Sequence, residues 1–136
     1  MTPVMALMKQ SKLPKPTDAE LSILRVLWDC GPSTVRKIWE QLNPKHQTGY
    51  TTILKLMQIM FEKGLLRRDE TERSHVYYAS VSQEQTQRQV VGHVLDRVFA
   101  GSAPRLVMQA LAGRKATREE LAEIRRLLDE MEGGAK

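Results

Sequence analysis

The stretch from residue 48 to residue 66 constrains the fold of this chain more than any other. Its apolar residues are spaced i, i+3, i+4 and i+7, as on one buried face of a helix, and they are Ile53, Leu56, Met57 and Met60. Gly64 follows and can end a helix, because glycine adopts the left-handed conformation without strain. The pattern predicts an amphipathic helix over about 49–63.

The opposite face of this helix carries short polar or basic side chains. At 100° per residue this face holds Thr51, Lys55 and Gln58, with no acid before Glu62. Such a surface suits a DNA major groove, where these residue types contact base edges and phosphates. The alternative interpretation is an ordinary solvated helix face. The neighbouring elements favour the DNA interpretation.

The distribution of charge along the chain also favours DNA binding. The chain has 21 Lys+Arg and 16 Asp+Glu, a net charge of +5. Residues 1–80 hold 12 basic and 8 acidic side chains, whereas residues 81–136 hold 9 and 8. The excess therefore lies mainly in the half that contains the 49–63 helix, as expected for a polyanion-binding domain.

Two helices are predicted before this one and a hairpin after it. Residues 17–20 form a capping box that opens the first helix, which ends at 30–32. Ser33 caps the second, which Asn43-Pro44 ends. Strand-like runs at 65–68 and 76–79 flank a polar turn at 69–74. Three helices and a hairpin are the winged helix-turn-helix order, so we predict a flexible leader over 1–16 and a winged-helix DNA-binding domain over 17–80.

The hairpin, or wing, is basic along its strands and acidic at its tip. Asp69, Glu70 and Glu72 argue against deep insertion of the tip into a groove, so the wing is predicted to contact only the DNA backbone. A purely stabilising hairpin is the alternative. The residues predicted to contact DNA are Tyr50, Thr51, Thr52, Leu54, Lys55, Gln58, Arg67, Arg68 and Arg73.

Residues 81–133 are predicted to form a helical dimerisation domain. Ser82 and Thr117 open capping boxes, and Pro104 suits the first turn of a helix between them. The wide apolar stripes of these three short helices are best buried against a second copy, which would also supply two half-site readers. The alternative is packing back onto the winged domain. The predicted interface residues are Val91, Val94, Leu95, Val98, Leu106, Leu121, Ile124 and Leu128.

No enzymatic or metal chemistry is predicted. Cys30 is the single cysteine, so no intrachain disulfide can form, and we expect a buried or half-buried thiol in a cytoplasmic protein. The three histidines lack the paired spacing of a metal site, and Ser74-His75 has no supporting acid for a catalytic triad. No cofactor and no membrane insertion are expected, since the apolar run 5–8 is too short to span a bilayer.

Several motifs together resemble those of the penicillinase repressor (BlaI/MecI) family. The resemblance covers about residues 17–131 and is carried by Thr17-x-Ala19-Glu20, Leu27-Trp28, Ser33-Thr34-Val35, Tyr50-Thr51-Thr52-Ile53-Leu54, Glu62-Lys63-Gly64-Leu65, Tyr77-Tyr78-Ala79 and Phe99-Ala100-Gly101-Ser102. It implies a homodimeric transcriptional repressor that binds a palindromic operator through the 49–63 helix. It also implies that Thr51 and Thr52 lie at the DNA.

The resemblance implies a route of release as well. In some members a membrane-bound sensor metalloprotease triggers cleavage at an Asn-Phe bond in the fifth helix, where this chain has Gln109 and Ala110. Copper sensing through C-terminal cysteines, known from a sister branch, is excluded because no cysteine follows Cys30. The competing hypothesis is a winged-helix protein-interaction module that does not read DNA.

Overall fold

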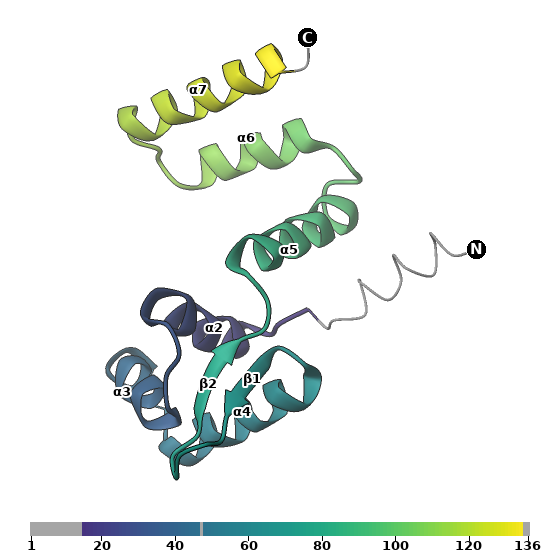
Figure 1. Ribbon diagram of the computed structural model, residues 1–136. Helices are drawn as coiled ribbons and strands as arrows, with labels where there is room; N and C mark the ends of the chain where they lie inside the picture. Colours follow the sequence, from purple (N-terminus) through teal and green to yellow (C-terminus); the bar gives the residue numbers. More distant parts are fainter. Residues whose placement is uncertain (1–14, 47, 135–136) are drawn as a thin grey trace, which may run out of the picture. The chain divides into compact units, whose positions relative to one another are not determined.

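The computed structural model describes residues 15–46 and 48–134, and the side chains of 44–46 and 134 fall outside that description. Most of the predicted leader over 1–16 therefore lies outside the described residues. The chain divides into two compact units, and the boundary in the sequence lies between Val90 and Val91, within the helix 83–97. The sequence predicted a boundary between residues 80 and 81. In chain order (Figure 1) the elements are α2 Asp18–Cys30, α3 Val35–His46, α4 Tyr50–Lys63, β1 Leu66–Asp69, β2 Val76–Ala79, α5 Gln83–Arg97, α6 Ala103–Gly113 and α7 Arg118–Gly134.

Three helices begin with the capping boxes expected from the sequence. In each box the cap hydroxyl accepts the backbone N–H of the third residue, whose side chain accepts the cap residue's N–H in return. The exchange satisfies backbone donors that the first turn leaves without helical partners. With the bond to the cap hydroxyl given first, the pairs are Thr17 with Glu20 (3.2 and 2.9 Å), Ser82 with Gln85 (3.0 and 3.1 Å) and Thr117 with Glu120 (3.0 and 2.8 Å).

Two helix ends differ from the prediction. α3 continues past Pro44 to His46, so the expectation that Asn43-Pro44 ends it was wrong. A proline in the last turn removes one backbone donor, and the helix can continue for two residues beyond it. α5 ends at Arg97, so Val98 lies in the following turn and not on the predicted helical stripe. There Ala100 and Gly101 take positive φ values of 51° and 82°.

The wing is a two-stranded antiparallel hairpin. Leu66 pairs with Ala79 and Asp69 with Val76, one residue later than the predicted start of the first strand. A third segment joins it, because Ser33 and Tyr77 exchange backbone hydrogen bonds of 2.9 and 2.8 Å. This bridge ties Ser33, two residues before α3, to the returning strand of the wing. The expectation that Ser33 caps this helix was wrong, because the Thr34 hydroxyl accepts the backbone N–H of Lys37 at 3.2 Å and takes that role.

One hydrophobic core lies among α2, α3, α4 and the hairpin. The predicted inner face of α4 is buried at Ile53, Met57 and Met60. Trp28 and Trp39 pack partly against this core, and their indole N–H groups donate to the carbonyls of Val81 and Thr48 at 3.0 and 2.8 Å. Cys30 is exposed, so the expectation of a buried or half-buried thiol was wrong: the helix end carries it outward. The other buried apolar residues are Ile23, Leu24, Leu27, Val35, Ile38, Leu42, Leu65, Leu66 and Tyr77.

The C-terminal unit has no such core within one chain. From Val91 to Gly133 no side chain is buried. Large apolar groups are open to solvent, with Val98 69%, Met108 66% and Met131 71% exposed. Across the described residues, no helix has the length and apolar character that crossing a bilayer requires.

Candidate nucleic-acid interface

The outer face of α4 is exposed as the helical spacing predicted. Thr51, Thr52, Lys55 and Gln58 are all exposed, and Leu54 is half-buried at the edge of this face. Lys63, in the last turn, and Gly64, with φ of 89°, complete the helix end. The surface offers hydroxyl, amide and ammonium groups along one side of a rigid helix.

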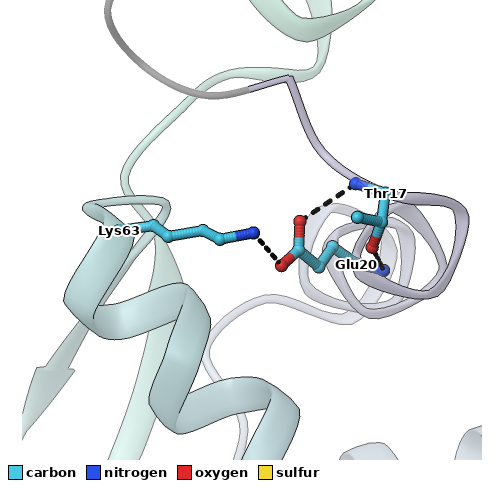
Figure 2. A network of polar contacts seen from close by, with 3 residues as sticks. All are labelled: Thr17, Glu20 and Lys63. Carbon is cyan, nitrogen blue, oxygen red and sulfur yellow. Dashed lines mark hydrogen bonds and ion pairs between the residues drawn. The ribbon is translucent and has the colours of Figure 1, made fainter.

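A buried ion pair fixes the C-terminal end of α4 (Figure 2). Lys63 Nζ donates to Glu20 Oε2 at 2.7 Å, while Glu20 Oε1 accepts the backbone N–H of Thr17 at 2.9 Å. Glu20 is 2% exposed and the Lys63 side chain 33%. Burial raises the pKa of Glu20, but the hydrogen bonds from Lys63 and Thr17 and the charge of Lys63 outweigh it, so the net pKa lies below its ordinary value. The carboxylate therefore stays ionised at neutral pH and holds α4 to the start of α2.

The N-terminal end of α4 is anchored by an aromatic pair. The rings of Trp39 and Tyr50 meet edge to face, with centroids 6.1 Å apart and planes at 78°. The indole N–H of Trp39 also donates to the carbonyl of Thr48, directly before the helix. Tyr50 remains 40% exposed. Both ends of α4 are thus held by α2 and α3.

Three of the predicted DNA-contacting residues share one cavity of about 320 Å³. Tyr50 and Leu54 from α4 meet Arg73 from the end of the wing's turn. The other residues that line the same cavity were not among the predicted DNA contacts, and they are Thr34, Val35, Arg36, Ser74, His75 and Tyr77. Among the described residues that line it, none is acidic. The cavity joins the first turns of α3 and α4 to the wing.

The remaining predicted residues lie apart from this cavity. Thr52 borders a different, largely apolar cavity with Asp18 and Leu42. Arg67 and Arg68 occupy opposite faces of β1, since neighbouring strand residues alternate. Arg67 is exposed beside Tyr78, its cross-strand partner.

Arg68 is engaged within the protein. Its guanidinium lies 4.0 Å from the ring centroid of Phe61 on α4, and it hydrogen-bonds the Tyr77 hydroxyl at 3.4 Å. It also forms an ion pair with Glu70. The hydrogen bonds to Glu70 and Tyr77 raise the pKa of Arg68. Arg68 thus joins the wing to α4 from the inner face.

The wing tip is negative, as its sequence indicated. The carboxylate of Asp69 accepts the backbone N–H of Thr71 at 2.9 Å, and this hydrogen bond lowers the pKa of Asp69. The pKa of Glu70 is lowered by its hydrogen bond from Arg68. Both acids are exposed and ionised at neutral pH, so the tip repels a phosphate backbone. No cluster of His, Cys, Asp or Glu suited to a metal ion occurs in the part of the chain that the structure describes.

Comparison with known proteins assigns the chain to a family. The sequence model described as penicillinase repressor matches residues 16–130. The penicillinase repressor of Bacillus licheniformis is 25% identical over 120 residues, covering 88% of this chain and 93% of that protein. The transcriptional regulator BlaI of Mycobacterium tuberculosis is 26% identical over 127 residues, covering 91% and 90%. The methicillin resistance regulatory protein MecI of Staphylococcus aureus is 20% identical over 113 residues, covering 83% and 92%.

A solved structure shares the fold. The transcriptional regulator Tm0710 from Thermotoga maritima superposes with a TM-score of 0.50 at 16% identity, covering 96% of this chain and 89% of that one. The predicted fold class, a winged helix-turn-helix followed by further helices, is confirmed. So is the predicted family, which consists of transcriptional repressors and not of enzymes. With 115 consecutive residues matched by its model, this chain belongs to the penicillinase repressor family.

Proposed function

We propose that this chain is a homodimeric, cytoplasmic repressor that binds a palindromic DNA operator through α4, with contacts from the wing to the DNA backbone. The observation that carries the proposal is the outer face of α4. Thr51, Lys55 and Gln58 are exposed on a helix whose two ends are fixed to α2 and α3. A rigid helix that presents hydroxyl, ammonium and amide groups has the chemistry of major-groove recognition.

The proposed roles follow from side-chain chemistry and position. Thr51, Thr52 and Gln58 contact base edges, where hydroxyl and amide groups discriminate between bases. Lys55, Arg67 and Arg73 neutralise phosphates. Tyr50 and Leu54 support the same surface from the cavity at the helix start. Arg68, which already holds Phe61, Tyr77 and Glu70, keeps the wing against α4 and shapes the surface indirectly.

The C-terminal unit supports the homodimer. Val91, Val98 and Leu128 are 48%, 69% and 55% exposed in the single chain. Exposed apolar area of this kind marks an interface, and a second copy presents the same stripes for burial by symmetry. The dimer also presents two copies of α4 to two half-sites. The other proposed interface residues are Val94, Leu95, Leu106, Leu121 and Ile124.

For release we propose proteolysis in α6, triggered by a membrane-bound sensor metalloprotease. Gln109 and Ala110 are both exposed on α6, a helix without any buried residue in the single chain. A helix with no fully buried side chain opens locally at low cost, and a protease needs an extended segment. The experiment is to co-express the chain with such a sensor under induction and to measure fragment masses. A cut elsewhere, or none, would reject the proposal for this bond.

Lys55→Ala tests the assignment of α4. The substitution removes one phosphate contact, so affinity for every duplex should fall and the slope of log K against log salt should shrink by about one. Binding would be measured by gel shift and fluorescence anisotropy on DNA from upstream of the chain's own gene. Lys115→Ala, which removes the same charge from an exposed site in the C-terminal unit, is the matched control. An unchanged slope for Lys55→Ala would reject the role of α4.

The alternative is a protein-interaction module without DNA binding. It requires neither the basic excess of the N-terminal half nor an acid-free start to α4. The same gel shift separates the two functions, because an interaction module retards no duplex at physiological salt.

A further inference from the structure

The cavity at the start of α4 has a chemistry that the predicted DNA contacts do not explain. Besides Tyr50 and Leu54 it is lined by the first turn of α3, through Thr34 and Arg36, and by the end of the wing's turn, through Arg73. Two arginine residues, each with a permanent positive charge, therefore line one space of about 320 Å³. None of its described lining residues is acidic, so it favours an anion.

We propose that this cavity, here called the phosphate seat, holds one backbone phosphate of each operator half-site, with Arg36 and Arg73 as its cationic partners. The inference rests on the proposed function and adds a contact from α3 that the recognition surface alone does not include. It also specifies that Arg73, which follows the acidic tip, makes one of the wing's phosphate contacts. Because a phosphate contact does not involve the bases, loss of the seat should lower the affinity for every DNA sequence by a similar factor.

Hydroxyl groups complete the seat. The Thr34 hydroxyl oxygen accepts the backbone N–H of Lys37 at 3.2 Å, which leaves its hydrogen to donate to a ligand. Ser74 and Tyr50 line the same space. Donors from three elements and two guanidinium groups match the acceptor oxygens of a phosphodiester.

The seat keeps its shape without a ligand. Ser33, next to Thr34, is bound to Tyr77 through two backbone hydrogen bonds. Tyr50 is held edge-on by Trp39. The α3, α4 and wing contributions are therefore fixed relative to one another, and binding needs little further ordering of the backbone.

The existing partner of Arg36 is easily displaced. Arg36 and Glu40 form an i,i+4 pair with Nε 3.6 Å from Oε2, and their side chains are 72% and 56% exposed. Exposed pairs of this kind contribute little to stability. A phosphate brings a full charge and several acceptor oxygens, so it competes well for the guanidinium.

The acidic tip explains why the contact falls beyond it. Asp69 and Glu70 are ionised and exposed at the turn, so the tip is repelled by a phosphate backbone. Arg73 lies after the tip, beside α3 and α4. Within the turn, the phosphate contact therefore falls at Arg73 and not at the acidic tip.

A methylphosphonate scan tests the seat in the full-length protein. The bound site in DNA from upstream of the chain's own gene is first located by footprinting. Each phosphate of that site is then replaced in turn by a neutral methylphosphonate, and affinity is measured for the wild type and for the Arg36→Ala/Arg73→Ala variant. At one phosphate per half-site, neutralisation should weaken the wild type about tenfold and the variant hardly at all. Circular dichroism and the melting temperature verify that the variant is folded.

Two further variants sharpen the test. Arg25→Ala removes the same charge from an exposed position on α2 that does not line the seat, and it should leave the loss at that phosphate unchanged. Glu40→Gln frees Arg36, so it should tighten binding about twofold on the intact duplex and have no effect once that phosphate is neutral.

The outcomes separate the seat from the proposed function. If the wild type binds no duplex, the proposed function fails. If the wild type binds, but neutralising each phosphate weakens the Arg36→Ala/Arg73→Ala variant as much as it weakens the wild type, the seat is overturned. A small phosphate compound could occupy the same cavity in place of the DNA backbone. Titration of the free protein with inorganic phosphate and a nucleoside monophosphate, at constant ionic strength, tests this alternative. Saturation at micromolar concentration would assign the cavity to a small phosphate and overturn the DNA assignment.

Discussion

The two units of this chain bury their apolar residues in opposite ways. The N-terminal unit encloses a core that includes Ile23, Ile38 and Met57, all fully buried within one chain. The C-terminal unit has helices of similar length and pattern, yet its side chains between Val91 and Gly133 are at most half-buried. Both have apolar stripes at helical spacing, so the stripe alone does not determine whether a helix is covered by its own chain.

The two units differ in which elements cover the apolar stripes of their helices. In the N-terminal unit, α2, α3 and α4 face a common centre, and the hairpin closes it through Leu66 and Tyr77. In the C-terminal unit the apolar residues of α6 and α7 are half-buried or exposed within the single chain. A unit of this kind is stable only when another surface covers it, which is why we propose that a second copy does so.

The largest expected effect comes from breaking the proposed partner surface. Leu95→Asp places a charge among apolar side chains that the dimer would bury, so the protein should become monomeric. Operator affinity should fall at least about a hundredfold in the same variant, since two weak half-site contacts then no longer act together. Sedimentation equilibrium and anisotropy would measure the two effects.

The control for this change is Gln87→Asp, which adds the same charge at an exposed position of α5. It should leave both mass and affinity unchanged. A monomeric Leu95→Asp protein that still binds the full operator as tightly as the wild type would contradict the proposed dimer.

A core deletion in the N-terminal unit should behave differently. Ile38→Ala removes a fully buried side chain and should lower the free energy of unfolding by about 2–4 kcal/mol at any protein concentration. Leu128→Ala, from the exposed stripe, should lower it by an amount that depends on concentration, because its contacts form only in the dimer. Urea unfolding at two concentrations measures both, and a concentration-independent effect of Leu128→Ala would favour a monomeric protein.

Local signals explain how much of this fold the sequence predicted. Capping boxes act over four residues, so Thr17, Ser82 and Thr117 marked three helix starts correctly. Helical spacing predicted the buried face of α4. The end of α3 was misjudged at Pro44, because one lost backbone donor in a last turn is tolerated there.

Long-range placement explains what the sequence did not predict at the site. Arg36 and Arg73 line one cavity although they are far apart in the sequence. The Ser33–Tyr77 backbone bridge joins the start of α3 to the wing, and no local pattern encodes that bridge. The different surroundings of Arg67 and Arg68 could have been anticipated, since adjacent strand residues face opposite sides. The exposure of Cys30 required knowing how α2 ends against its neighbours.

The ion pair between Lys63 and Glu20 lies within the N-terminal unit, so it tests the stability of that unit without involving a second copy. Lys63→Met should cost about 2 kcal/mol at pH 7, because Glu20 would be a buried carboxylate without its cation. The pKa of Glu20 is lowered in the folded protein, so its contribution is present above the ordinary glutamate pKa and is lost as the pH falls through the lowered one.

The stability gap between the wild type and Lys63→Met should therefore narrow as the pH is lowered below 4, measured by urea unfolding across pH 3–7. Glu62→Gln, at the neighbouring exposed acid, should show no such gap. A gap that stays constant with pH would mean that Lys63 acts through packing and not through its charge.

The smallest expected effect is a gain in stability. It tests whether a glycine in α5 lowers the stability of the C-terminal unit. Gly92 lies inside α5 just after the boundary between the units, and a Cβ built on it meets no atom within 4 Å. Gly92→Ala should then stabilise α5 by about 0.5–1 kcal/mol, because alanine loses less backbone freedom in a helix. If the melting temperature rises while dimer mass and operator affinity are unchanged, the glycine serves no close contact in the assembly. If the dimer weakens instead, α5 of a second copy approaches at Gly92, and the partner surface extends to this side of the helix.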